Sequence, residues 1–190
     1  MTQAKTLTSK ELKHVLEQIS LGTHAKRDRA MLLTLFYSGM RVGEVAALLY
    51  SDVVDESGEV KKEIKLAAEQ TKGGVGGIVY VSDKLIKELK DYLKAYPCTN
   101  KQHKLFYTQK NKARGFTANT LAQHFYHLFK RCGISGASSH SGRRTFITNL
   151  AEKGVGVRVL QSLARHKSIS TTQVYIDVND AMKRKAVELV

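Results

Sequence analysis

The chain has 190 residues, of which 42% are hydrophobic and one is proline, and this composition favours a single compact globular domain with its own core. Its 31 lysines and arginines exceed its 17 aspartates and glutamates, and the net charge of +14 indicates a polyanionic partner, with nucleic acid ahead of a membrane surface. Without an apolar run of about 18 residues or a signal-peptide pattern near Met1, we expect no membrane segment.

The first part of the chain is predicted to be helical. The segment TLTSKELKHVLEQIS has Thr8 or Ser9 as an N-cap, followed by apolar residues at helical spacing. A second helix, AKRDRAMLLTLFYSG, ends at Gly39, and a third, VGEVAALL, begins just after Arg41. Arg41 is therefore expected at the junction of two helices.

Between residues 53 and 81 the pattern changes from helical to extended. The runs EIKLAA and GIVYVS are β-like, and the intervening EQTKGGVGG predicts a hairpin with a flexible, glycine-rich turn. Lys72 lies on this turn, from which its side chain can reach across a cleft.

The second half of the chain returns to helical periodicity. The segment SDKLIKELKDYLKAY begins at Ser82 or Asp83 and stops before Pro97, and FTANTLAQHFYHLFKRCG is capped by Thr117. Further helices are expected over residues 139–153, 157–165 and 179–188. The predicted fold class is mixed α+β, mainly α-helical with one small antiparallel β-sheet.

The segment SSHSGRRTFITNLAEKG contains candidate phosphate ligands. His140 and Arg143 are three residues apart, so near the start of a helix they share a face and can donate to one phosphate. A helix N-terminus also favours an anion. A solvated basic face is the alternative interpretation of this spacing, and these residues alone leave both open.

We expect neither a metal nor a cofactor. His124 and His127 have the spacing of a zinc pair, but no acidic or cysteine partner supports them, so packing is the preferred interpretation. Cys98 and Cys132 lack C-x-x-C spacing, which favours reduced thiols in a cytoplasmic protein.

The order of these segments is more specific than any one of them. An arginine in SGMRVGEVAALL, a lysine on a β-turn, His-x-x-Arg at a helix start, and LQSLARHKSISTTQVY with its histidine and final tyrosine follow one another. In this order the sequence closely resembles the catalytic domain of the tyrosine recombinase family, the phage-integrase type of site-specific DNA recombinase. The resemblance runs over residues 8–178 and implies the tyrosine recombinase catalytic-domain fold.

The resemblance implies a catalytic set at the matching positions Arg41, Lys72, His140, Arg143, His166 and Tyr175. By itself Tyr175 would be interpreted as a packing residue, whereas the resemblance makes it the nucleophile that forms a 3′-phosphotyrosine ester without metal or ATP. The two arginines would stabilise the charge on the nonbridging phosphate oxygens. Lys72 would protonate the leaving 5′-oxygen, His140 would accept a proton or bind the phosphate, and His166 would hydrogen-bond the phosphate.

Further residues are implied around this set. Glu44, three residues after Arg41, would brace the catalytic arginines. Contacts to the DNA backbone, with ordinary surface charge as the alternative, are expected from Lys112, Arg114, Lys130, Arg131 and Arg144. Two positions depart from the family, because Gly142 stands where many members have leucine and Arg165 replaces the glycine before the second histidine.

The implied function is that of a site-specific recombinase or integrase, of phage or mobile-element type, that cleaves and rejoins double-stranded DNA at a specific recombination site. A homotetramer is expected on DNA, with a monomer allowed in isolation, and the expected location is the cytoplasm, in association with the nucleoid through DNA. The alternatives are a type IB topoisomerase-like enzyme that relaxes DNA and a noncatalytic DNA-binding module.

The expected domain organisation is a catalytic domain over residues 1–178 and a C-terminal helical tail over residues 179–190. The tail would dock onto a neighbouring copy or onto its own domain. The N-terminal core-binding domain that family members usually carry is expected to be absent from this chain, which would weaken DNA binding.

Overall fold

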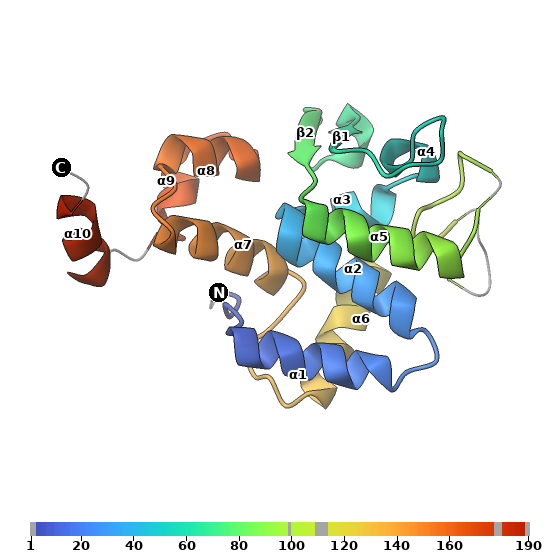
Figure 1. Cartoon of the computed structure of the whole chain (residues 1–190), viewed down its shortest axis with the longest axis horizontal. Coiled ribbons are helices and arrows are strands. Elements are labelled where there is room, and N and C mark those ends of the chain that lie inside the picture. The colour runs from blue at the N-terminus through green and yellow to red at the C-terminus, as the bar shows by residue number, and fades with distance from the viewer. Residues whose placement is uncertain (1–2, 99, 109–113, 177–179, 189–190) are drawn as a thin grey trace.

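The structure is a computed structural model that describes residues 3–98, 100–108, 114–176 and 180–188. Its elements in chain order are α1 (Ser9–Ser20), α2 (Ala25–Ser38), α3 (Val42–Ala47), α4 (Tyr50–Val53), β1 (Glu63–Leu66), the 3-10 helix η1 (Ala68–Gln70), β2 (Gly77–Tyr80), α5 (Asp83–Ala95), α6 (Ala118–Arg131), α7 (Ser141–Glu152), α8 (Val157–Ala164), α9 (Ile169–Gln173) and α10 (Asp180–Val187) (Figure 1). Most described residues are helical, and β1 and β2 form a two-stranded antiparallel sheet. The predicted fold class is confirmed.

The long helices begin where their capping residues predict. The Thr8 hydroxyl accepts the Glu11 amide at 3.2 Å and the Glu11 carboxylate accepts the Thr8 amide at 2.9 Å, so the start of α1 is a reciprocal capping box. Ser82 and Thr117 cap α5 and α6 through their hydroxyls. Where the sequence allows Thr8 or Ser9, and Ser82 or Asp83, the caps are Thr8 and Ser82.

Three short elements, α4, η1 and α9, are not predicted by periodicity. A tertiary contact joins the first two, because the Asp52 carboxylate accepts the Gln70 side-chain amide at 2.6 Å. The same carboxylate caps α4 locally by accepting the Leu49 amide at 2.8 Å. Gln70 also donates to the Ala47 carbonyl at 3.3 Å. These contacts fix the base of the turn that connects β1 to β2.

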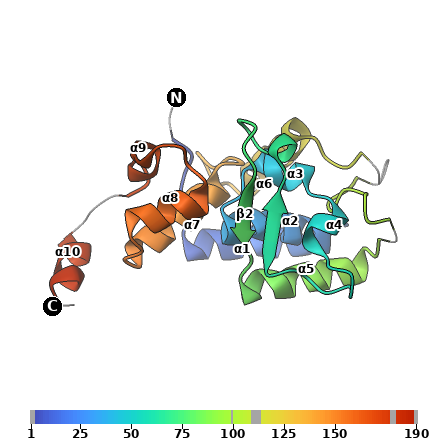
Figure 2. The same cartoon turned by 90° about the horizontal axis from the view of Figure 1, so that it is seen from above.

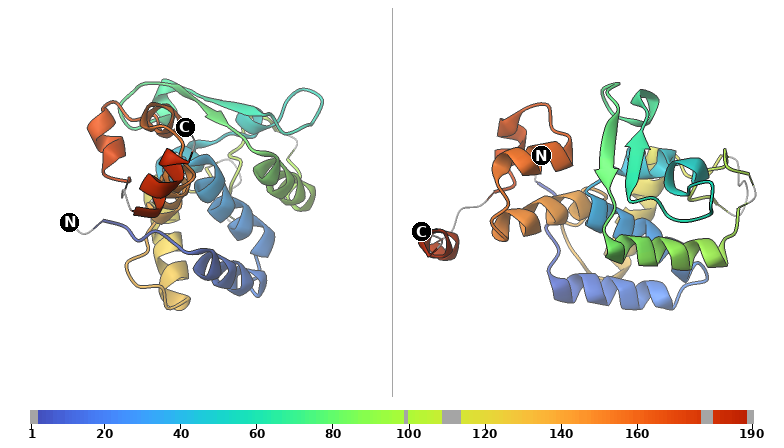
Figure 3. Two further views of the ribbon diagram at one scale, coloured as in Figure 1. Left: turned by 60° about the vertical axis from the view of Figure 1, so that its left-hand side comes forward. Right: turned by 45° about the horizontal axis from the view of Figure 1, so that its top comes forward.

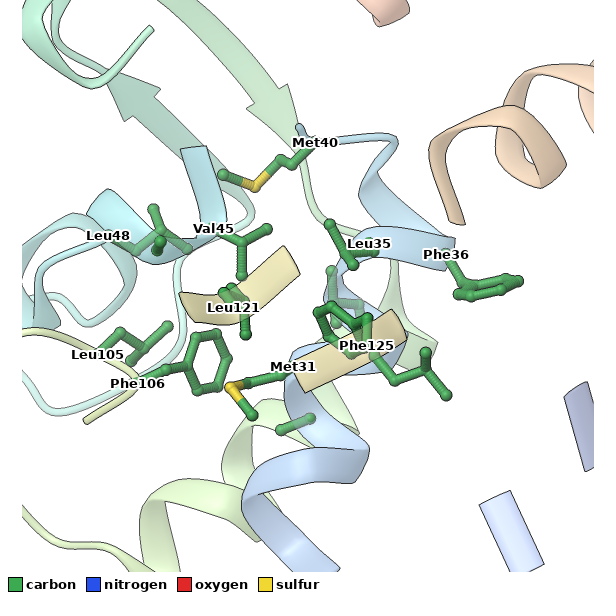
Figure 4. Close-up of a cluster of buried hydrophobic side chains, with 14 of the residues drawn as sticks. Met31, Leu35, Phe36, Met40, Val45, Leu48, Leu105, Phe106, Leu121 and Phe125 are labelled. Atoms are coloured by element: carbon green, nitrogen blue, oxygen red, sulfur yellow. The ribbon is translucent and has the colours of Figure 1, made fainter. Parts of the chain in front are cut away.

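The hydrophobic core surrounds α2. This helix packs against α1, α5 and α7, and α3 packs against α6 (Figure 1). Figure 4 shows Met31 and Leu35 of α2 meeting Leu121 and Phe125 of α6, and all four side chains are buried. The four-residue spacing in each helix places an apolar stripe on the inward face, which is why these segments are helical and pack together.

The C-terminal helices form a second part of the molecule. Figures 1 and 3 show α8 and α9 above α7, on the same side of the body as the β1–β2 hairpin, with α10 at the far end beyond α9. Figure 2, seen from above, shows α7 and α8 beside the hairpin, which overlies α2 in this view. Across the described ranges, every helix is too short or too polar to cross a lipid bilayer.

Candidate active site

The implied catalytic set lies around two neighbouring hollows, one beside α7 and the N-terminal segment and one between the hairpin and the residues after α8. The first, named here the Tyr175 hollow, is lined by residues that include His140, Arg143, Arg144, Val174 and Tyr175. The second, the Lys72 hollow, is lined by residues that include Arg41, Glu44, Lys72, Arg165, His166 and Lys167. The hollows are adjacent, because the ring of His166 in the Lys72 hollow stacks on the ring of Tyr175 in the other, with 5.6 Å between centroids. Residues from all parts of the predicted set are thus brought together.

Arg143 is a buried arginine held by two backbone carbonyls. It is 5% exposed, and it donates from Nη1 to the Gly39 carbonyl at 2.7 Å and from Nη2 to the Ala164 carbonyl. These carbonyls end α2 and α8, where a helix favours a cation. Burial, followed by the charge of Arg41, lowers the pKa of the Arg143 guanidinium to about 10, so it stays charged at neutral pH.

Gly142 explains how α7 approaches α2 closely enough to place Arg143. A Cβ added at this position would lie 2.7 Å from the Leu35 Cβ and 3.1 Å from the Leu35 carbonyl carbon. Because even a methyl group would collide with α2, the departure from leucine allows the two helices to come close.

Glu44 is the buried carboxylate that holds Arg41. Arg41 precedes the first turn of α3, and it gives its amide to Glu44 Oε2 at 2.8 Å and its Nη1 to Oε1 at 2.9 Å. Glu44 is 1% exposed. Burial opposes its ionisation. The charges of Arg165 and Arg41 and the hydrogen bond from the Arg41 amide nevertheless hold the pKa of Glu44 below its usual range. A charged Glu44 provides the contact that a bracing role requires.

Lys72 lies exposed on the turn between β1 and β2, as the sequence predicts. The Thr71 hydroxyl can donate to the Val75 carbonyl at 2.7 Å, which closes the turn behind the lysine. A Cβ at Gly73 would lie 3.6 Å from Lys167 Nζ, so a second lysine reaches this turn. The Lys72 hollow is therefore strongly cationic.

His140 and Arg143 differ more in environment than their three-residue spacing suggests. His140 precedes α7 and is exposed, whereas Arg143 lies inside the helix and is buried. Both side chains nevertheless line the Tyr175 hollow. An exposed imidazole and a buried guanidinium thus share this hollow with Tyr175.

His166 is a buried neutral histidine. It is 9% exposed, its Nδ1 lies 2.9 Å from the Thr172 hydroxyl, and its ring plane is 19° from that of Tyr175. Burial, with the nearby charges of Arg143, Arg41 and Arg165, lowers its pKa to about 4. When Thr172 donates to Nδ1, the neutral ring carries its proton on Nε2, which can then donate to a phosphate oxygen.

Tyr175 lies just after α9 and is held by its backbone and its ring. Its amide donates to the Thr172 carbonyl at 3.0 Å, and its carbonyl accepts the Thr148 hydroxyl at 3.3 Å. The guanidinium carbon of Arg144 lies 5.5 Å from the centroid of the Tyr175 ring. The ring therefore contacts both Arg144 and His166.

The candidates for DNA-backbone contacts have different surroundings. Arg144 donates from Nε to the Thr6 hydroxyl at 3.2 Å and from Nη1 to the Gln3 side chain, so it binds the N-terminal segment as well as contacting Tyr175. Lys112 lies outside the described residues. The remaining candidates, which are exposed, are Arg114, Lys130 and Arg131.

Two contributors to the site are not identified from sequence. Thr172 is fully buried under His166, and Lys167 reaches the Lys72 turn. The second threonine of ISTTQ gives no indication of its orientation, because α9 is too short for a periodic pattern.

The structure shows the surroundings of His124 and of the two cysteines, for which the sequence favours roles other than metal binding. The Nε2 of His124 lies 3.5 Å from an Asp28 carboxylate oxygen, and its ring packs against Phe125. Cys98 and Cys132 are free thiols, and Cys132 is buried.

Comparison with known proteins finds one family and relatives that are named tyrosine recombinases. Residues 5–182 match the model of the phage integrase family. The chain is 31% identical over 189 residues to tyrosine recombinase XerA of Pyrococcus furiosus. The alignment covers 98% of this chain and 62% of that protein. It is 30% identical over 184 residues to tyrosine recombinase XerC of Caldanaerobacter subterraneus, covering 95% of this chain and 49% of the relative. The chain thus spans less than two thirds of the length of these relatives.

Solved structures share the whole fold. A crystal structure of XerA recombinase matches all of this chain and 66% of its own, with a TM-score of 0.76 and 28% identity. The integrase of transposon Tn1549, in complex with transposon right end DNA, matches all of this chain and 67% of its own with a TM-score of 0.75 and 18% identity, a likeness of fold alone.

Proposed function

Since the chain belongs to the phage integrase family, we propose that it is the catalytic domain of a site-specific recombinase that cleaves and rejoins DNA strands through a 3′-phosphotyrosine intermediate. The observation that carries the proposal is the meeting of the two hollows, where Tyr175 stacks on His166 beside the buried Arg143. A tyrosine that only packed would not need a fixed cation and a neutral imidazole at its side.

The nucleophilic step forms a bond from Tyr175 Oη to the phosphorus and breaks the bond from phosphorus to the 5′-oxygen. Negative charge grows on the nonbridging oxygens, where Arg41 and Arg143 can donate. His140, exposed in the Tyr175 hollow, takes the phenol proton. The covalent ester keeps the energy of the broken bond, so rejoining reverses the step without a high-energy cofactor.

The leaving 5′-oxygen receives its proton from Lys72. An alkoxide is a poor leaving group, and a lysine on an exposed turn can reach an oxygen on the side of the phosphate opposite the nucleophile. His166, neutral at pH 7, donates from Nε2 to the phosphate. In this assignment the Tyr175 hollow is the nucleophile side and the Lys72 hollow is the leaving-group side.

The partner is double-stranded DNA at a specific site, supported by the net charge of +14 and by the exposed Lys72 and Lys167 of the Lys72 hollow. We extend the proposal to a homotetramer on DNA, located with the nucleoid in the cytoplasm. The catalytic domain covers residues 1–178, and residues 179–190 form a tail that couples neighbouring copies.

The test is covalent capture of labelled DNA. Duplexes taken from the DNA flanking the gene are incubated with the chain and with Tyr175→Phe, and the products are separated on a denaturing gel. The unchanged chain gives a slow, protease-sensitive labelled band, and Tyr175→Phe gives none while binding DNA equally.

Other outcomes identify the alternatives. On a supercoiled plasmid, relaxed topoisomers without joined products from two sites would indicate a topoisomerase. DNA binding with no adduct from the unchanged chain would indicate a noncatalytic module and would contradict the proposal.

A further inference from the structure

Arg165 has a backbone conformation that its residue type disfavours. Within the described ranges it is the one non-glycine residue with a positive φ, at φ 53° and ψ 47°, directly after α8. Glycine adopts this left-handed conformation without penalty, whereas a Cβ makes it costly. Such strain persists where the surrounding contacts require it, and it occurs often at functional sites.

The side chain of Arg165 makes the contact that offsets this cost. Its Nη2 donates to Glu44 Oε2 at 2.5 Å, and its Nη1 donates to the Leu163 carbonyl at 3.3 Å. The arginine side chain is 13% exposed and Glu44 is 1% exposed, so the ion pair is largely withdrawn from water. Because Arg41 occupies Oε1 of the same carboxylate, Glu44 is shared between two arginines.

The hairpin has a glycine, Gly77, at the point where the Arg165 side chain crosses it. A Cβ at Gly77, the first residue of β2, would lie 2.6 Å from Cδ of Arg165. The aliphatic part of Arg165 therefore passes directly over the strand that follows the Lys72 turn. Arg165 connects the end of α8 to α3 on one side and to the hairpin on the other.

We propose that Arg165 is a positioning residue for DNA cleavage, which fixes Glu44 and, through it, the guanidinium of Arg41 against the phosphate. The inference deepens the proposed function and rests on it. The Arg41 side chain is 28% exposed and this residue precedes a helix of only six residues, so its orientation depends on Glu44. With Arg165 absent, a buried carboxylate with unused acceptor capacity would draw further donors of Arg41 away from the phosphate.

The first test separates the charge of Arg165 from its backbone. Arg165→Gly supplies the residue that the left-handed backbone prefers but removes the ion pair, and Arg165→Lys keeps the charge. Arg29→Gln is the matched control, because it breaks an arginine–glutamate pair with Glu88 on α2 and α5, away from the hollows. Adduct formation is timed at saturating DNA, and DNA affinity is measured separately.

We expect Arg165→Gly to form adduct at least about tenfold more slowly at saturating DNA, since a small misplacement of a catalytic group is costly. Its Kd for DNA stays within about twofold, because Arg165 acts through Glu44 rather than on the DNA. Arg165→Lys recovers part of the rate, and Arg29→Gln reacts like the unchanged chain. An Arg165→Gly rate equal to that of the unchanged chain, or a loss seen only in Kd, would overturn the inference.

The second test moves Arg165 without changing its charge. Gly77→Ala places a methyl group against Cδ of Arg165, and we expect slower cleavage from this change. In an Arg165→Gly background the same substitution has little further effect, because the group it displaces is gone. If the two substitutions slow cleavage by factors that simply multiply, the inference about Arg165 is overturned while the proposed function stands. An unchanged chain that forms no adduct would overturn the proposed function and the inference with it.

Discussion

The Tyr175 hollow and the Lys72 hollow hold their functional groups in opposite ways. On the Tyr175 side, Arg143 is buried and bound to two backbone carbonyls, and the tyrosine ring is stacked on His166. On the other side, Lys72 is exposed on a turn, and ion pairs to Glu44 orient the arginines. Under the proposed assignment, the difference predicts that the nucleophile side is preorganised and that the proton donor, Lys72, is held less firmly.

The largest effect should come from the preorganised side. Arg143→Lys keeps a positive charge but loses the planar donor group that spans the Gly39 and Ala164 carbonyls. We expect adduct formation to fall by about a thousandfold, because a fixed donor to the developing charge is lost. Single-turnover cleavage at saturating DNA measures this, and a loss below tenfold would contradict a preorganised Arg143.

The Lys72 side should show a chemical defect that the substrate can correct. Lys72→Ala removes the proton donor, and we expect cleavage about a hundredfold slower. With a 5′-sulfur in place of the 5′-oxygen, the leaving group needs no proton, so Lys72→Ala should cleave at nearly the rate of the unchanged chain. Arg143→Lys should stay slow on the same substrate. Equal rescue of both variants would remove the distinction between the two sides.

The close approach of α7 to α2 gives a third test. Gly142→Ala places a methyl group 2.7 Å from the Leu35 Cβ, so α7 must shift and carry Arg143 with it. We expect a loss of up to about 3 kcal/mol in the free energy of unfolding, with slower cleavage. Urea denaturation measures the loss. Gly43→Ala serves as the control, because a methyl group there would meet only the Ala118 Cβ at an ordinary contact distance of 3.5 Å.

His166 should show the smallest effect, in the pH dependence of stability. Its pKa falls from 6.5 to about 4 in the folded protein, so below about pH 6.5 the unfolded chain binds more protons than the folded one. This histidine therefore stabilises the fold above about pH 6.5, and the contribution is lost as the pH falls toward 4.

The measurement compares the unchanged chain with His166→Gln, which does not titrate. Between about pH 7.5 and pH 5, the free energy of unfolding of the unchanged chain should fall by about 2 kcal/mol more than that of the variant. Parallel curves would show that His166 is not held neutral by its surroundings.

The same two regions show what the sequence predicts and what it does not. The long helices follow from apolar spacing and from caps such as Thr8 and Thr117, because these signals are local. The order of the motifs identified a candidate set whose members line two neighbouring hollows. The separation into two hollows was not predictable, since it depends on how α7, α8 and the hairpin meet.

The positions that depart from the family illustrate the limit most clearly. From sequence, Gly142 is a weak helix residue and Arg165 an added charge. Their reasons are tertiary: the first makes room for Leu35 and the second pairs with Glu44, 121 residues away in the chain. Thr172 is missed for the same reason, since only the fold brings its hydroxyl to His166.

A crystal structure of the trapped adduct would test the two-sided arrangement most directly. The chain is reacted with a nicked duplex whose cleaved strand diffuses away, so that the covalent complex accumulates. The account predicts a bond from Tyr175 Oη to the phosphorus, Arg41 and Arg143 on the nonbridging oxygens, and Lys72 facing the position of the departed 5′-oxygen. A phosphate bonded to another residue, or Lys72 on the same side as the tyrosine, would contradict it.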